Sequence, residues 1–178
     1  GYIEGTVADS IKKLGKIVEV IKKPFTLSSL IDLIEDKELY VELEKLNVNE
    51  LYAMIKVDGV AKAYKIGDLN KMPPVLANDV VGNTPVIVSW CPLCNTLTAY
   101  DRRVDGKALT FKEDGARNIP GTEIENLHFR DLETNSAWAQ GPGIAVEGQL
   151  KGAELKALPM QLFNRDRIDK MGVEVWKP

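Results

Sequence analysis

Residues 86–101 read V-I-V-S-W-C-P-L-C-N-T-L-T-A-Y-D, and the prediction of the fold starts from this stretch. It places the only two cysteines of the chain, Cys91 and Cys94, between two segments rich in β-branched and aromatic side chains. Such side chains suit a pleated, half-buried surface, so the pattern predicts two strands joined by a C-P-L-C turn. Two sulfurs so close in sequence can close a disulfide, hold half of a metal site, or be buried as small apolar groups.

Two further turns predict β-hairpins. Asp58-Gly59 separates residues 51–57 from 60–66, and Asp105-Gly106 separates 100–104 from 107–111. Asp-Gly is a strong hairpin signal because both turn positions need a positive φ. A turn at 81–84 then leads into the segment that precedes the cysteines.

In the C-terminal half of the sequence, glycine and proline predict a loop at 113–123. A short strand is expected at 127–131, and it carries the only histidine, His128. Residues 144–150 can pair with 155–158 across Lys151-Gly152. A helix is expected over about 159–170, with proline in its first turn, and a strand follows at 173–176.

Before residue 49, apolar spacing predicts a helix at 6–14, a strand at 17–21 and a helical region from 28 to 46. We therefore expect an α+β fold. A β-rich domain of antiparallel hairpins spans 49–178, with helices near the two termini of the chain. Residues 1–48 form a helical extension packed on its core.

The composition excludes several classes of protein. The 178 residues are 44% hydrophobic and 28% charged, with a net charge of −3. No basic stripe suggests a nucleic-acid partner, and no apolar run is long enough to span a bilayer. The chain begins with Gly1 and not Met, as an exported protein does after its signal segment is removed, although a cleaved tag would look the same. We expect an extracytoplasmic protein, either periplasmic, cell-surface or secreted, that can form homo- or hetero-oligomers.

Three segments resemble the motifs of a prokaryotic domain-of-unknown-function family, number 3179. Residues 78–94, which include N-D-V-V-G-N-T-P-V and S-W-C-P-L-C, are similar to its N-D-x-x-G-x-P-V and [WY]-C-P-L-[CT] signature. Residues 130–140, with Arg130-Asp131, Thr134, Ser136, Trp138 and Gln140, look like its Y-D-R-x-T-x-S-x-W-x-Q element. Residues 146–159 are similar to its G-x-x-x-G-x-x-L-x-x-L-P tail. The resemblance covers roughly residues 50–176 and implies a mostly exported, β-rich domain without an established activity.

The chain departs from that family in ways that bear on a site. Members often carry His-Glu where this chain has Pro74-Val75, the position of His128 is commonly Met, and Cys94 is often Thr. If these positions line a site, cysteine with methionine or histidine suggests a soft metal such as copper. Because Cys91 can occur without a cysteine at position 94 in that family, the pattern argues against an obligate disulfide.

The residues themselves leave the chemistry open. A reactive C-x-x-C usually begins a helix, whose dipole stabilises the thiolate, and here a strand is expected instead. A structural disulfide or a slow redox pair remains compatible with export. A metal site of Cys91, Cys94 and His128 would suit a copper or zinc ion, although zinc needs a fourth ligand.

Four other residues could support such a site, and each also has a structural explanation. Asn95 can take the left-handed conformation after the turn, and Asp131 can form a turn with backbone hydrogen bonds. Trp90 and Trp138 fit a core or an interface.

Two functional hypotheses follow. The first is an exported domain that holds a soft metal ion or a redox-active cysteine pair at the C-P-L-C turn. The second is a non-catalytic structural or interaction subunit of a larger assembly, in which the cysteines brace the turn. No nucleophile-base arrangement stands out, so enzymatic activity is left open and a non-enzymatic role is favoured.

Overall fold

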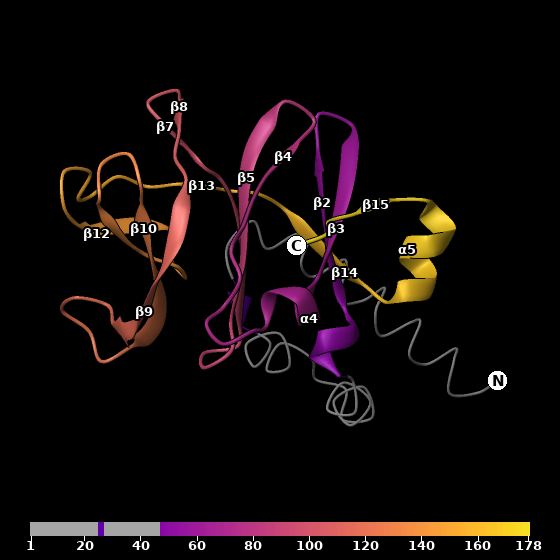
Figure 1. Cartoon of the computed structure of the whole chain (residues 1–178), viewed down its shortest axis with the longest axis horizontal. Coiled ribbons are helices and arrows are strands. Elements are labelled where there is room, and N and C mark those ends of the chain that lie inside the picture. Colours follow the sequence, from indigo (N-terminus) through magenta and orange to yellow (C-terminus); the bar gives the residue numbers. More distant parts are fainter. Residues whose placement is uncertain (1–24, 27–46) are drawn as a thin grey trace.

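The computed structural model describes residues 25–26 and 47–178, which form stacked β-sheets (Figure 1). The central sheet has the order β1-β6-β5-β4, and β13 also pairs with β6. Its strands are β1 (Phe25–Thr26), β4 (Ala77–Val81), β5 (Thr84–Cys91), β6 (Thr96–Asp101) and β13 (Lys156–Ala157). The predicted helices at 6–14 and 28–46 and the strand at 17–21 lie outside the described residues, so the helical extension stays a prediction.

Two further sheets flank the central one. The first, here called the outer sheet, has the order β12-β11-β10-β9, with β9 (Phe111–Asn118), β10 (Glu125–Asp131), β11 (Ala137–Ala139) and β12 (Ile144–Glu147). The second, here called the terminal sheet, has the order β14-β2-β3-β15, with β2 (Tyr52–Val57), β3 (Val60–Lys65), β14 (Met160–Phe163) and β15 (Glu174–Val175). Small elements complete the described part: the 3-10 turn η1 (Val48–Glu50), helices α4 (Ile66–Leu69) and α5 (Arg165–Met171), and the hairpin of β7 (Arg103–Val104) and β8 (Lys107–Ala108).

The central strand β5 is buried on both faces. Val86, Val88 and Trp90 pack in a core shared with the terminal sheet. Ile87 and Cys91, which alternate with them, pack in a second core shared with the outer sheet. Because side chains of a strand point alternately to opposite faces, one apolar run supplies both cores. This alternation places Cys91 between the central and outer sheets.

A third core lies on the far face of the terminal sheet. Tyr52, Met54 and Phe163 pack there with Ile168 of α5. The layers therefore run α5, terminal sheet, central sheet and outer sheet, as Figure 1 shows from the yellow helix to the orange strands. None of the helices in the described part of the chain is both long and apolar enough to cross a membrane.

The turn predictions are confirmed. Residues Asp58 and Asp105 have φ of 51° and 49°, and each hairpin forms at its Asp-Gly pair. The turn at 81–84 joins β4 to β5 in a third antiparallel hairpin. The β-rich expectation is also confirmed for the described residues, whereas helices are few there, so the α+β expectation holds only in part.

Three predictions for the C-terminal half are wrong in part. Most of 113–123 is not a loop, because β9 extends to Asn118 and pairs with β10 around a bulge at Asp114-Gly115. Residues 156–157 pair with β6 of the central sheet, whereas the pairing partners of 143–145 are residues 152–155, through backbone hydrogen bonds and one isolated bridge. The first residues of the expected helix at 159–170 form β14, since its side chains alternate between two cores, and α5 begins only after the Asn164 cap.

A close approach of backbone and ring joins the central and outer sheets. Tyr100 of β6 donates its hydroxyl to the carbonyl oxygens of Gln140 and Gly141, at 2.8 and 2.6 Å. Gly143 lies directly against this buried ring, since a Cβ there would come within 2.6 Å of Tyr100 Cε1. Gly143 also has a φ of 66°, which favours glycine.

Replacing Gly143 with alanine should therefore destabilise the fold by roughly 2 kcal/mol or more, because it adds a steric overlap to left-handed strain. Gly152→Ala is the matched control: its φ is 92° and nothing lies within 4 Å of the added Cβ, so only the strain of about 1 kcal/mol is expected. Chemical unfolding of both variants measures the difference. Equal losses of unfolding free energy in the two variants would show that the contact between Gly143 and Tyr100 does not restrict the residue at position 143.

Candidate functional site

The C-P-L-C turn is closed by a disulfide. Cys91 ends β5 and Cys94 lies in the turn before β6, with the two sulfurs 2.13 Å apart and the Cα atoms 5.5 Å apart. Both cysteines of the chain are thus paired. Asn95 has a φ of 47°, so the left-handed conformation expected after the turn is confirmed.

Each sulfur of this disulfide accepts a hydrogen bond. The backbone N–H of Cys94 donates to Cys91 Sγ over 3.3 Å. The side-chain amide of Asn126, in β10 of the outer sheet, donates to Cys94 Sγ, also over 3.3 Å. Hydrogen bonds to sulfur favour the charged thiolate over the neutral thiol. The site therefore has a donor for each of the two thiolates that reduction would release.

The Asn126 amide is held in one orientation. Its Oδ1 accepts the N–H of Gly141 at 2.7 Å, and its Nδ2 also donates to Gln140 Oε1 at 3.2 Å. Since the backbone N–H of Gly141 can only donate, the amide nitrogen of Asn126 must face the sulfur. Asn126 is 4% exposed, so water does not compete freely for these bonds.

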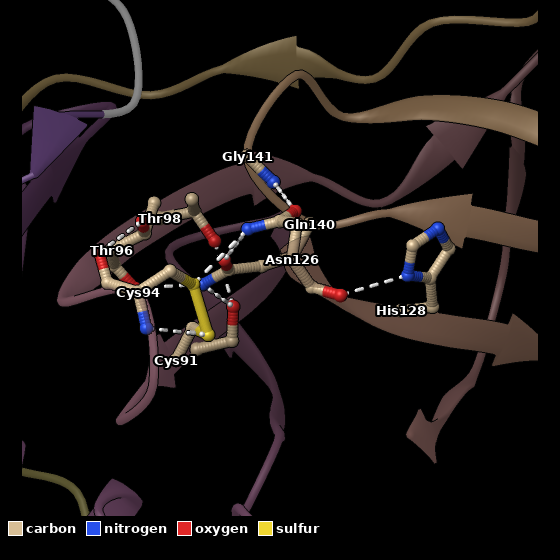
Figure 2. Close-up of a disulfide and its surroundings, with 9 residues drawn as sticks. Cys91, Cys94, Thr96, Thr98, Asn126, His128, Gln140 and Gly141 are labelled. Atoms are coloured by element: carbon tan, nitrogen blue, oxygen red, sulfur yellow. Dashed lines mark hydrogen bonds between the residues drawn. A yellow bond between two sulfur atoms is a disulfide. The ribbon is translucent and has the colours of Figure 1, made fainter. Parts of the chain in front are cut away.

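A buried polar network continues from Gln140 into the central sheet. Gln140 Nε2 donates to Ser89 Oγ at 3.2 Å and to the carbonyl of Thr96 at 2.8 Å. Ser89 and Thr98 share a hydroxyl hydrogen bond of 2.7 Å across β5 and β6. Figure 2 shows this chain of contacts between Thr98 and Asn126, beside the disulfide. Because buried polar groups are costly unless paired, the network fixes the position of the outer sheet against the turn.

The two cysteine residues differ in exposure. Cys91 is 1% exposed and belongs to the second core, whereas Cys94 is partly exposed. A pocket of about 210 Å³ lies beside the turn, and Cys91 contributes to its wall. As a whole residue, Cys94 is therefore more exposed to solvent than Cys91.

His128 lies apart from the disulfide. Its Nδ1 is 2.9 Å from the carbonyl oxygen of Asn126, and in Figure 2 the imidazole ring is on the far side of Asn126 from the sulfurs. A carbonyl can only accept, so Nδ1 carries the proton and Nε2 is the acceptor. Nε2 is buried and has no hydrogen-bond partner among the described residues.

The structure does not bring the expected metal ligands together. Among the described residues no group of three or more His, Cys, Asp and Glu side chains is placed to hold a metal ion. The two sulfurs are bonded to each other and His128 points elsewhere. Coordination by Cys91, Cys94 and His128 stays a prediction for the reduced protein alone.

The residues expected to support the site divide between two places. Trp90 packs in the core shared with the terminal sheet, on the opposite face of β5 from Cys91. Asp131 accepts hydrogen bonds from Thr134 and from Trp138 Nε1, at 2.8 Å for each side-chain donor. These contacts form a turn at the other end of β10 from Asn126, which matches the structural explanation for Asp131.

Sequence reasoning missed Asn126. It lies 32 positions from Cys94 and belongs to no motif quoted above. Gln140 was visible only as the last residue of the 130–140 element. No spacing rule could connect either residue with the cysteines, because the contact depends on how two sheets are stacked.

A comparison with protein families identifies the chain. The family model described as "Protein of unknown function (DUF3179)" matches residues 35–171. The chain belongs to this family. The resemblance inferred from the N-D and C-P-L-C motifs is thus confirmed. No curated protein and no solved structure matches the chain. The functional argument for this DUF3179 member therefore rests on its own geometry.

Burial lowers the pKa of His128 below its ordinary value of 6.5; Arg117 lowers it further, while the bond to Asn126, Asp114 and Glu147 act in the opposite direction. The unfolded chain thus binds a proton more readily than the folded protein, and stability falls as pH drops below 6.5. Between pH 7.5 and 5.5 we therefore expect this residue to lower the free energy of unfolding, by about 1 kcal/mol at most.

His128→Met should abolish that loss, since the chain has no other histidine. The measurement is urea unfolding of both proteins at the two pH values. The shifted carboxyl groups, Asp79, Asp101 and Asp114, do not interfere: burial raises their pKa values, but ion pairs outweigh it and lower them, so they act at still lower pH. Parallel pH profiles for the two proteins would contradict the assignment.

Proposed function

We propose that this DUF3179 domain is an extracytoplasmic thiol-disulfide exchange site, in which Cys91 and Cys94 exchange electrons with cysteines of a partner polypeptide. The observation that carries the proposal is the pair of N–H donors, one directed at each sulfur. The disulfide itself supports an extracytoplasmic location, because disulfides persist mainly in oxidising compartments.

Bracing alone explains the disulfide poorly. The β5–β6 register already pairs Cys91 with Thr96, so backbone hydrogen bonds close the turn without the sulfurs. A cross-link that closes so short a loop adds only about 2 kcal/mol in the chain-entropy model. A redox role accounts for the oriented Asn126 amide, which bracing does not require.

The unequal burial of the two cysteine residues suggests which sulfur is attacked and which one leaves. A partner thiolate attacks the partly exposed Sγ of Cys94, the Cys91–Cys94 bond breaks, and Cys91 leaves as a thiolate at the N–H of Cys94. A second partner thiolate then attacks the partner sulfur of the mixed disulfide and releases Cys94 as a thiolate at the Asn126 amide. The partner's two thiols are oxidised to a disulfide, and their two protons reach Cys91 and Cys94 through solvent.

Single-cysteine variants test these roles. Cys91→Ser leaves the accessible Cys94, which should form a mixed disulfide with glutathione disulfide; Cys94→Ser leaves the buried Cys91, which should react at least about tenfold more slowly. Mass spectrometry of the folded proteins over time gives both rates. If neither variant reacts while folded, the cysteines only brace the turn, as expected of a structural subunit. Equal rates would overturn the assigned roles.

Replacing Asn126 tests the role of its side-chain amide as a hydrogen-bond donor to Cys94. Asn126→Leu should make the reduction potential of the disulfide more negative by about 30 mV, because the loss of a hydrogen bond to a thiolate disfavours the reduced form by about 1.4 kcal/mol. The potential is measured by equilibration with glutathione buffers.

Asn78→Leu is the matched control for this variant. Asn78 also bridges two sheets with its amide, through two bonds of 2.8 Å to the backbone of Phe111, but it bonds no sulfur. Its loss should lower the melting temperature and leave the potential unchanged. A potential that stays constant in Asn126→Leu as well would contradict the role of the amide.

A further inference from the structure

An apolar pocket adjoins the disulfide. It has a volume of about 210 Å³ and is lined by Met72, Pro73, Pro74, Cys91, Pro92, Leu93, Glu113, Ala116 and Leu127. Its lining thus includes three of the four residues of the C-P-L-C turn. Two apolar side chains of the lining are unusually exposed, Met72 at 79% and Leu93 at 64%.

These features are typical of a binding surface. Apolar side chains that gather around a hollow mark sites where a ligand or partner covers them. A cavity of about 150 Å³ already accommodates a benzene ring, so this pocket has room for a large apolar side chain. A polypeptide segment that inserts one there runs directly past the disulfide, because Cys91, Pro92 and Leu93 form part of the wall.

The backbone of the pocket restricts how a segment can bind. Three of its lining residues are prolines, which have no N–H to donate to a bound strand. Recognition therefore depends on an inserted side chain more than on added backbone pairing.

The wall of the pocket includes a charged side chain. Glu113 is the only charged residue in the lining that the described part of the chain contributes, and the carboxylate is fixed by the N–H of Gly115 at 2.6 Å. A carboxylate at the edge of an apolar pocket attracts a cationic group and repels an anionic one.

We propose that this pocket is the docking site for the partner of the exchange reaction, a polypeptide whose reactive cysteine is next to a large apolar residue and near a basic one. The inference rests on the proposed thiol-disulfide exchange and adds its specificity. The apolar residue fills the pocket, the basic residue pairs with Glu113, and the cysteine is thereby held beside the Cys91–Cys94 disulfide.

The test uses the oxidised full chain and two reductants. One is a synthetic peptide with a single reduced cysteine flanked by leucine and lysine; the other is dithiothreitol, which needs no pocket. Ala116→Phe puts a ring into the pocket from an exposed position of β9, and should slow reduction by the peptide about tenfold, since burial of a leucine side chain is lost. The rate with dithiothreitol should not change.

Lys112→Phe is the matched control, because it adds the same ring to an exposed position of the same strand outside the pocket lining. It should leave both rates unchanged. If Ala116→Phe and Lys112→Phe react equally fast with the peptide, the docking site is refuted while exchange at Cys94 stands. If the wild-type disulfide resists both reductants while folded, the exchange function itself fails.

Charge selection is measured separately with Glu113→Gln. The wild-type protein should react several-fold faster with the lysine peptide than with one carrying glutamate instead, and the variant should lose this preference. Since Glu113 is only partly buried and the variant keeps an acceptor for Gly115, folding is expected to be unaffected. An unchanged preference in the variant would refute the role of Glu113.

Discussion

The structure depends on one constraint: both faces of strand β5 must be buried at once. Val86, Val88 and Trp90 pack toward the terminal sheet, and Ile87 and Cys91 pack toward the outer sheet. A strand apolar on both faces needs a layer on each side, so a single hairpin would leave half of it in water. The outer sheet satisfies this requirement, and in doing so it brings Asn126 to the end of the strand where the cysteines lie.

The polar network between the central and outer sheets extends to the disulfide. Ser89, Thr98 and Gln140 are fully buried, and their hydrogen bonds satisfy one another. A network of this kind holds the sheets in one register, since any shift would leave buried groups unpaired. The outer-sheet residue of this network, Asn126, donates from its side-chain amide to Gln140 and also to the sulfur of Cys94. Reduction of the disulfide would strengthen that contact, because a thiolate is a better acceptor than a disulfide sulfur.

Local turns were predictable, and the pairing of distant strands was not. Asp58-Gly59 and Asp105-Gly106 form hairpins because their φ angles depend on the turn residues themselves. Gly115, Pro120 and Gly121 predict a loop at 113–123, yet the backbone of residues 113–118 pairs with β10. Residues 160–163 followed a proline that suggested a helix, but the available edge of β2 made them a strand.

The sequence by itself determined the family, the β-rich core and the position of the cysteine pair in a strand-turn-strand unit, because these depend on neighbouring residues. It could not decide what the cysteines do, and it offered His128 as a partner on the ground of chemistry alone. Tertiary structure joined the two cysteines in a disulfide, placed Asn126 against Cys94 and turned the His128 ring away. The physical reason is that a hydrogen bond between two stacked sheets depends on their packing, which the residues near either end of the bond do not encode.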